Sequence, residues 1–369
     1  MKKISISKGV FLNDDAVRGF IEYLVKLING KENCFYHSYR NRKTKGEWSC
    51  NSLQDAFKQY DWKGKSYLET KGLLDGFKGE LRKAFNSNNN KAFKVVCRNI
   101  LKWGGVLPQN TTWLDNHDTI LVDSFSESKE MLTDQEELKL DKADWNEKGR
   151  RNTSKFRMNA GYTKIYSLLC DDFIIYDSRV AAALGKLVVN FLNENKNENF
   201  TELKKKLAFK VMPAKEGENC NSPKIRKPIS QHIKFTGINN SGFSHAEWNV
   251  KANWILAAAV EKAVENSKMS WGGDNKQDKL RALEAALFMI GYDLPIPSDK
   301  KEKNTPVKGK LPKIIKEKVT SKKEQAIEIY KNNKGKKRPQ IIELLINEAN
   351  LTKAGASTYY NNCKNRWVS

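Results

Sequence analysis

The chain has 369 residues and a net charge of +23, with 66 Lys and Arg against 43 Asp and Glu. This length allows one large domain and a second small one. It contains no apolar run of membrane-spanning length and no signal-peptide-like apolar region near its start, so we expect a soluble, cytoplasmic monomer that does not contact a membrane.

The cysteines exclude the common metal centres. Six Cys are scattered singly along the chain, no Cys-x-x-Cys or Cys/His cluster is present, and only four His occur. Zinc and iron–sulfur sites need clustered ligands of these types. We therefore expect no metal and no cofactor, and scattered thiols suit a reducing compartment.

The charge is unevenly distributed. Residues 300–369 carry 18 Lys and Arg against 6 acids, whereas residues 115–147 carry 11 acids against 3 bases. A basic chain without membrane segments favours a nucleic-acid partner, although a well-solvated surface would give the same total. The acidic segment, expected to be partly loop, should face away from DNA or act as a lid.

The first hundred residues predict amphipathic helices separated by polar turns. Asn13 or Asp14 can cap the first helix and Gly30 ends it. The helices are expected over residues 11–30, 52–60, 66–85 and 91–103.

A basic, aromatic loop is expected over residues 34–50. Tyr36, Tyr39 and Arg40 lie in it, and such a mixture suits stacking on a base and pairing with phosphates. Packing of the same rings against the helical body is an equal alternative. Trp103 opens a Trp-Gly-Gly sequence, which either allows close approach of a ligand or simply ends the preceding helix.

A second cluster of cations, at residues 148–157, follows the acidic segment and precedes the most informative stretch of the chain. It is a candidate for phosphate contacts and includes Arg150, Arg151, Lys155 and Arg157.

The stretch from Asn159 to Leu184 predicts a helix, a short extended run and a second helix. Phe173–Tyr176 is wholly apolar and should cross the core. Asp177 then stands where an N-cap belongs, beside Arg179. The pattern predicts a carboxylate held at a positively polarised helix end, which is either a structural cap or a reactive group.

The second half of the chain predicts three more helices before a linker. They are expected over residues 201–208, 246–265 and 277–291, and residues 295–320 should be a basic linker.

The last fifty residues predict three short helices of helix-turn-helix size. Thr352 caps the third helix, and the charge favours DNA over the alternative of a protein-binding bundle. The basic side chains expected to contact DNA are Lys336, Lys337, Arg338 and Lys353.

Residues 159–180 resemble the core of the helix-hairpin-helix DNA glycosylase superfamily, in which a helix and an apolar run precede the catalytic Asp. The resemblance implies that Asp177 in IIYDSRV is that carboxylate. Bifunctional members carry a Schiff-base lysine about eighteen residues earlier, where this chain has Asn159. The resemblance therefore implies a monofunctional enzyme. Lys155 and Lys164 lie nearby but out of register, and either could restore lyase activity if the alignment is shifted. The family's L-P-G-x-G hairpin sequence is absent.

A wider resemblance covers roughly residues 10–295. Residues 103–105, 175–186 and 281–294 resemble bacterial proteins with an 8-oxoguanine-glycosylase-like fold, some of which remove glucosylated hydroxymethylcytosine from phage DNA in anti-phage defence. The sequence TKAGASTYYNN resembles a small DNA-binding tail module.

Together these features predict a mainly α protein with a helix-hairpin-helix glycosylase-like body over 1–295, a linker over 296–320 and a DNA-binding module over 321–369. The expected function is monofunctional base excision from double-stranded DNA by base flipping. The expected catalytic residues are Asp177 and Asn159. The expected base pocket is formed by Tyr36, Tyr39 and Trp103. Phosphates would be bound by Arg40, by Arg179 and by the cations of residues 148–157. The alternative is a non-catalytic DNA-binding regulator in which Asp177 is only a cap.

Overall fold

A computed structural model describes most of the chain in two compact units, Met1–Asp299 and Lys300–Ser369. The described residues are 2–30, 34–41, 46–106, 108–145, 153–195, 206–213, 224–265, 269–294, 322–349 and 351–367. Both units are mainly helical, as expected. No described helix has the length and apolarity needed to cross a membrane.

The N-terminal part of unit 1 begins with a strand that the sequence did not predict, and the predicted helix over 11–30 is divided. The Asp14 side chain accepts from the Ala16 amide and so caps the longer helix. The elements are β1 (Lys3–Ser7), α1 (Lys8–Leu12), α2 (Asp15–Asn29), β2 (His37–Arg40), β3 (Glu47–Cys50), α3 (Leu53–Lys58), α4 (Tyr67–Asn86) and α5 (Asn90–Trp103).

The basic aromatic loop expected over 34–50 contains an antiparallel hairpin. Strands β2 and β3 pair with His37 opposite Cys50 and Arg40 opposite Glu47. Alternating aromatic and polar residues suit a strand with one buried face, and this period-two pattern was the signal that the prediction missed.

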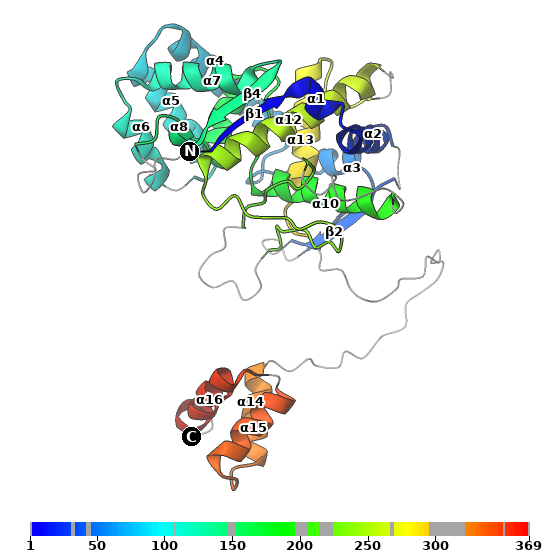
Figure 1. Ribbon diagram of the computed structural model, residues 1–369, viewed down its shortest axis with the longest axis vertical. Coiled ribbons are helices and arrows are strands. Elements are labelled where there is room, and N and C mark those ends of the chain that lie inside the picture. Colours follow the sequence, from blue (N-terminus) through cyan, green and yellow to red (C-terminus); the bar gives the residue numbers. More distant parts are fainter. Residues whose placement is uncertain are drawn as a thin grey trace. The chain divides into compact units, whose positions relative to one another are not determined.

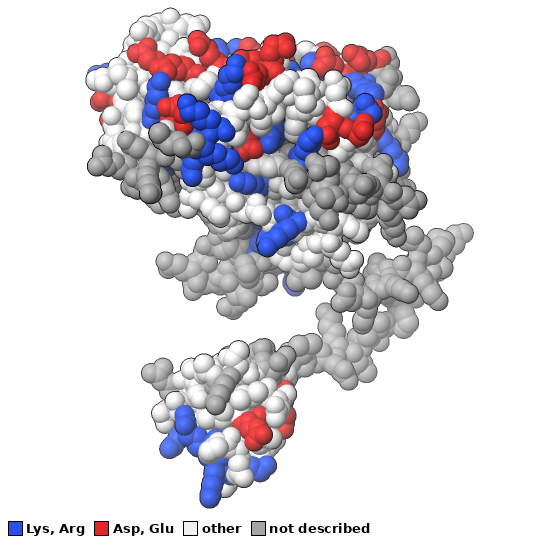
Figure 2. Space-filling model, in the orientation of Figure 1, with Lys and Arg blue, Asp and Glu red and all other residues white. Residues whose placement is uncertain are grey.

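The acidic segment is more regular than expected. Together with the residues just before it, this segment forms η1 (Pro108–Thr111), α6 (Thr112–Asn116), α7 (Leu121–Thr133), β4 (Glu137–Asp141) and α8 (Lys142–Trp145). Strand β4 pairs antiparallel with β1, with Lys3 opposite Asp141. In the view of Figure 2, acidic side chains gather along the edge of unit 1 that carries α7 and β4.

The remaining helices of unit 1 are α9 (Tyr162–Leu169), α10 (Ser178–Glu194), α12 (Gly242–Glu265) and α13 (Lys276–Ile290). Figure 1 shows α10, α12 and α13 in the middle of the unit, with α2 and α3 on one side and α4, α5 and α7 on the other. One continuous hydrophobic core joins these helices. Residues 201–205 of the predicted helix 201–208 lie outside the described residues.

Unit 2 is a three-helix module, α14 (Lys322–Asn332), α15 (Arg338–Glu348) and α16 (Lys353–Asn362), followed by a π-helical turn, η2 (Cys363–Trp367). Its small core includes Ala326, Ile341 and Leu345. The Thr352 side chain accepts from the Gly355 amide, which confirms the predicted cap of the third helix.

Candidate active site

The apolar run Phe173–Tyr176 is buried, as predicted. It has no partner strand among the described residues, and side chains from neighbouring helices satisfy its backbone instead. The amides of Ile174, Ile175 and Tyr176 donate to Asn253 Oδ1 (2.9 Å), Glu284 Oε2 (2.7 Å) and Thr163 Oγ1 (2.9 Å). The Tyr176 carbonyl lies 2.8 Å from His245 Nε2, and the Ile174 carbonyl accepts from Asn249 at 3.2 Å.

These bonds hold the residue that follows the run. Asp177 is 9% exposed and caps α10, as predicted, because its Oδ1 accepts from the amides of Arg179 (2.9 Å) and Val180 (3.2 Å). The positive end of the helix dipole stabilises a carboxylate at this position. Its second oxygen, Oδ2, makes neither of these cap bonds and lies 3.8 Å from Lys164 Nζ.

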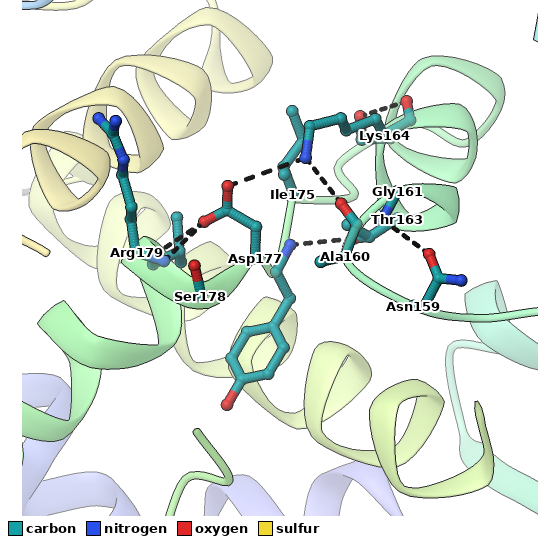
Figure 3. Close-up of polar contacts among 12 residues, drawn as sticks. Asn159, Ala160, Gly161, Thr163, Lys164, Ile175, Asp177, Ser178 and Arg179 are labelled. Atoms are coloured by element: carbon teal, nitrogen blue, oxygen red, sulfur yellow. Dashed lines mark hydrogen bonds and ion pairs between the residues drawn. The ribbon is translucent and has the colours of Figure 1, made fainter. Parts of the chain in front are cut away.

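Lys164 comes from the first turn of α9 and is 7% exposed. Its ammonium also donates to the Ala160 carbonyl at 2.7 Å, as Figure 3 shows. The aliphatic stem runs past Gly104, where a Cβ would lie 2.6 Å from Lys164 Cδ. The Trp-Gly-Gly sequence at the end of α5 therefore leaves room for this lysine, a role that neither interpretation of the sequence included.

Asn159 takes a different position from the one predicted. Its Oδ1 accepts from the amides of Gly161 (2.7 Å) and Tyr162 (3.1 Å), so it fixes the turn that leads into α9. In Figure 3 it lies beyond Ala160 as seen from Asp177. The residue that the fold brings to Asp177 is Lys164, thirteen positions before it instead of eighteen.

Asp177 and Lys164 open onto a hollow of about 920 Å³, a volume that includes open solvent at its mouth. One part is aromatic and the other is charged. The aromatic walls are Tyr60, Trp62, Tyr67, Trp103 and Phe288. The charged part follows one face of α4 and the facing side of α13, and comprises Lys71, Asp75, Lys78, Asp278, Arg281 and Glu284.

Two polar atoms of the aromatic walls are buried without a hydrogen-bond partner among the described residues. They are Trp62 Nε1 and Tyr67 Oη. An unpaired buried donor costs free energy, and such groups are expected to be used by a ligand or by water. Burial raises the pKa of Tyr67, and also that of Tyr60, so both phenols keep their protons at neutral pH.

A second carboxylate, Glu284, faces the same hollow. Its Oε2 accepts from the Ile175 amide and from Arg281 Nη1 (2.8 Å), and Arg281 also donates to the Ser167 carbonyl of α9. Burial raises the pKa of Glu284, and the Arg281 guanidinium opposes that rise. The pair thereby joins α13 to α9 and to the run that precedes Asp177.

Arg179 points away from Asp177 into an aromatic cluster. Its guanidinium lies 4.0 Å from the ring centre of Phe288, 4.8 Å from that of Tyr292 and 5.6 Å from that of Trp62. Burial lowers its pKa, and cation–π contacts favour the charged form. Gly291 allows this packing, because a Cβ there would overlap the Arg179 carbonyl oxygen.

Of the three residues predicted for the base pocket, only Trp103 lines the hollow. Tyr36 is 65% exposed elsewhere on the surface. Tyr39 is buried in a stack between Trp48 (4.6 Å) and Tyr292 (4.9 Å), which is the packing alternative that the sequence left open. The walls that the sequence did not identify come from the turn before α4 and from α13.

The predicted phosphate contacts are dispersed. Lys155 forms an ion pair with Glu127 at 2.5 Å, and the Arg157 guanidinium lies over the Tyr162 ring at 5.9 Å. Arg40 is exposed on β2. Arg150 and Arg151 lie outside the described residues.

In unit 2, the predicted DNA-contacting side chains lie between α14 and α15 and at the start of α16. Lys336, Lys337 and Arg338 are exposed. The Arg338 guanidinium lies 5.5 Å from the Tyr360 ring centre. Lys353 begins α16, and its side chain lies outside the described set.

Among the described residues, no group of three or more His, Cys, Asp or Glu could hold a metal ion. No protein-family model, curated protein or solved structure matches the chain.

Proposed function

We propose that the protein is a DNA glycosylase that removes a flipped base by hydrolysis and leaves an abasic site. One observation carries the proposal: the buried Asp177 carboxylate uses one oxygen as a helix cap and leaves the other beside Lys164 at an aromatic hollow. Cleavage of an N-glycosidic bond needs little more from a protein than a stabilised sugar cation and a positioned water.

Each step can be assigned to a group of the site. The bond between base and sugar breaks with its electron pair moving to the base, and the Asp177 carboxylate stabilises the oxocarbenium-like sugar. Water adds to the sugar carbon, and its proton passes to Asp177 and then to solvent. The departing base anion takes up a proton from solvent.

The hollow suits a base that has left the stack. Base-flipping enzymes hold the extruded base between aromatic side chains and by hydrogen bonds to its edge. Trp62 and Tyr67 provide both an aromatic face and an unused polar atom. The charged part along α4 extends past the aromatic walls, and we propose that it takes a polar substituent of a damaged or modified base, with glucosylated hydroxymethylcytosine as the first candidate.

Lys164 supports a second candidate reaction. A lysine amine beside a carboxylate is the arrangement that forms a Schiff base with the sugar aldehyde in enzymes that also cut the strand. The ion pair and the bond to the Ala160 carbonyl favour the protonated, non-nucleophilic amine, so hydrolysis is our main proposal. Trapping with borohydride separates the two reactions.

We also propose that unit 2 adds affinity for DNA without choosing the base. Its exposed cations can neutralise phosphates, and such contacts are largely independent of sequence. Unit 1 would then carry out base release, and unit 2 would hold the enzyme on the DNA.

The decisive experiment incubates the full chain with a panel of DNAs, including phage DNA with hypermodified cytosine, and detects released base by mass spectrometry. Asp177→Asn keeps an oxygen that can cap α10 and is the matched control. Base release by the wild type, lost in the variant while DNA binding persists, supports the enzyme. Equal behaviour of the two proteins contradicts it and leaves the non-catalytic DNA-binding regulator.

A further inference from the structure

We propose that residues 224–235 form a binding surface for the phosphodiester backbone of DNA beside the hollow. This inference rests on the proposed function, because it names the part of unit 1 that would grip the strand from which the base is removed. Another predicted phosphate contact on unit 1, the Lys155 ammonium, is already paired with Glu127.

The segment is basic and contains no acid. Its sequence, KIRKPISQHIKF, contributes Lys224, Arg226, Lys227 and Lys234 and no Asp or Glu. Asp293 packs against it, but this carboxylate is 8% exposed and accepts from the Ile225 amide at 2.7 Å. The outward charge of the segment is therefore wholly positive.

Its side chains divide into a buried set and an exposed set. Lys227 and Lys234 are exposed, and no carboxylate among the described residues lies within ion-pair distance of either. The buried set, which fixes the segment on unit 1, comprises Arg226, Pro228, Ile233 and Phe235. An anchored backbone with outward ammonium groups loses little conformational entropy on binding a polyanion.

Arg226 places the segment next to the reactive carboxylate. Its Nη1 donates to Ser178 Oγ at 2.6 Å, and Ser178 directly follows Asp177. Its Nε donates to the Tyr292 carbonyl at 2.9 Å. Burial lowers the pKa of Arg226 to about 10, so the guanidinium is still charged at neutral pH. Further along α10, Pro228 packs against Gly185, where a Cβ would lie 2.6 Å from Pro228 Cγ.

A line of contacts connects this surface with the hollow. Phe288 lines the hollow, Arg179 lies over Phe288 and also over Tyr292, and Lys224 Nζ lies 4.4 Å from the Tyr292 ring centre. This series of contacts therefore begins at an aromatic wall of the hollow and ends at a cation of the surface. A flipped nucleotide has the same order, a flat base at one end and a phosphate at the other.

The test compares two triple variants of the full chain in DNA binding from low to high salt. Lys224→Gln/Lys227→Gln/Lys234→Gln removes three cations of the surface. Lys83→Gln/Lys91→Gln/Lys142→Gln removes three exposed lysines elsewhere on unit 1 and is the charge-matched control. A plot of log affinity against log salt has a negative slope, and each lost phosphate contact makes that slope shallower by about 0.9.

We expect the slope of the first variant to be shallower than that of the wild type by about 2 to 3, and the slope of the control to be unchanged. If the two variants have equal slopes while the wild type releases base, the proposed DNA-binding surface is wrong and the proposed glycosylase activity stands. A wild type that neither binds DNA nor releases base would overturn both proposals. Weakened binding to anionic lipid vesicles with unchanged DNA binding would assign the surface to a membrane and also contradict the inference.

Discussion

Lys164 Nζ lies 3.8 Å from Asp177 Oδ2, and both side chains belong to residues that are at least nine-tenths buried. The two residues come from different helix ends, and each also bonds to backbone groups of its own helix end. A charge pair this deeply buried is costly unless it is well bonded, and it is common at functional sites. The pair therefore defines the most informative set of variants.

Replacing Asp177 by Asn and by Ala separates chemistry from folding. Asn keeps a cap oxygen but leaves the buried Lys164 ammonium without its carboxylate, so we expect base release to fall by about 10²- to 10⁴-fold and the free energy of unfolding to fall by about 3 kcal/mol. Ala removes the cap as well, and the free energy of unfolding should fall by about a further 1 kcal/mol. Single-turnover base release and denaturant unfolding measure the two effects. A fully active Asp177→Asn enzyme would exclude a catalytic role.

Borohydride treatment during reaction with abasic DNA tests the nucleophile. For hydrolysis we expect no covalent protein–DNA adduct, because the Lys164 amine is held as an ammonium by Ala160 and Asp177. Denaturing gels detect such an adduct directly. An adduct formed by the wild type and absent from Lys164→Gln would instead establish the Schiff-base reaction.

Gly104→Ala should disturb the site from the side of α5. The added Cβ would lie 2.6 Å from Lys164 Cδ, so the lysine side chain must shift from its position beside Asp177. We expect a loss of about 1 to 3 kcal/mol of stability together with slower base release. Gly79→Ala on α4 is the control, because its Cβ would meet nothing within 4 Å. That helix change should stabilise by about 0.5 to 1 kcal/mol and leave the rate unchanged.

Stability should fall as the pH drops from about 6.5 to about 4, because two buried histidines resist protonation. Burial lowers the pKa of His245 to about 4, and that of His37 likewise to about 4. The unfolded chain binds these protons first, so acid favours unfolding in this window. In the His245→Gln variant, the loss of unfolding free energy across this pH window should be smaller by on the order of 1 to 3 kcal/mol. Thermal melts at several pH values across this window measure the effect. If the melting temperatures of wild type and variant fall equally with pH, the prediction is wrong.

Removal of residues 296–369 should lower DNA affinity and its salt dependence, while base release at saturating DNA persists. The removed part carries the exposed cations of unit 2, whereas Asp177 and Lys164 belong to unit 1. Titrations at several salt concentrations measure the affinity. A truncated chain that saturates normally but releases no base would show that unit 2 takes part in the chemistry.

The parts of the site that are local in sequence were predictable. The cap at Asp177 and the buried run before it follow from neighbouring residues and were confirmed. The partnership of Lys164 with Asp177 was not, because an interval counted along the chain does not show how the run between α9 and α10 folds back. This contact also depends on the room that Gly104 leaves, and that glycine ends α5, a helix distant in the sequence.

The hollow could not be assembled from the sequence, because its walls come from segments more than a hundred residues apart. Trp62 and Tyr67 precede or begin α4, whereas Glu284 and Phe288 belong to α13. Helical spacing indicated that α13 has a buried face, but not that part of this face lines a cavity. The hairpin β2–β3 was missed because its alternation is short and interrupted by cations.

The way in which the run Phe173–Tyr176 is held has a consequence for local motion. Its amides are bonded to side chains of three separate helices, α9, α12 and α13, so no single helix can fray and release it. Exchange of these amide hydrogens with solvent should then require opening of the whole unit. The carboxylate that follows is consequently positioned only in fully folded molecules, and under the proposed function partly folded chains would release no base.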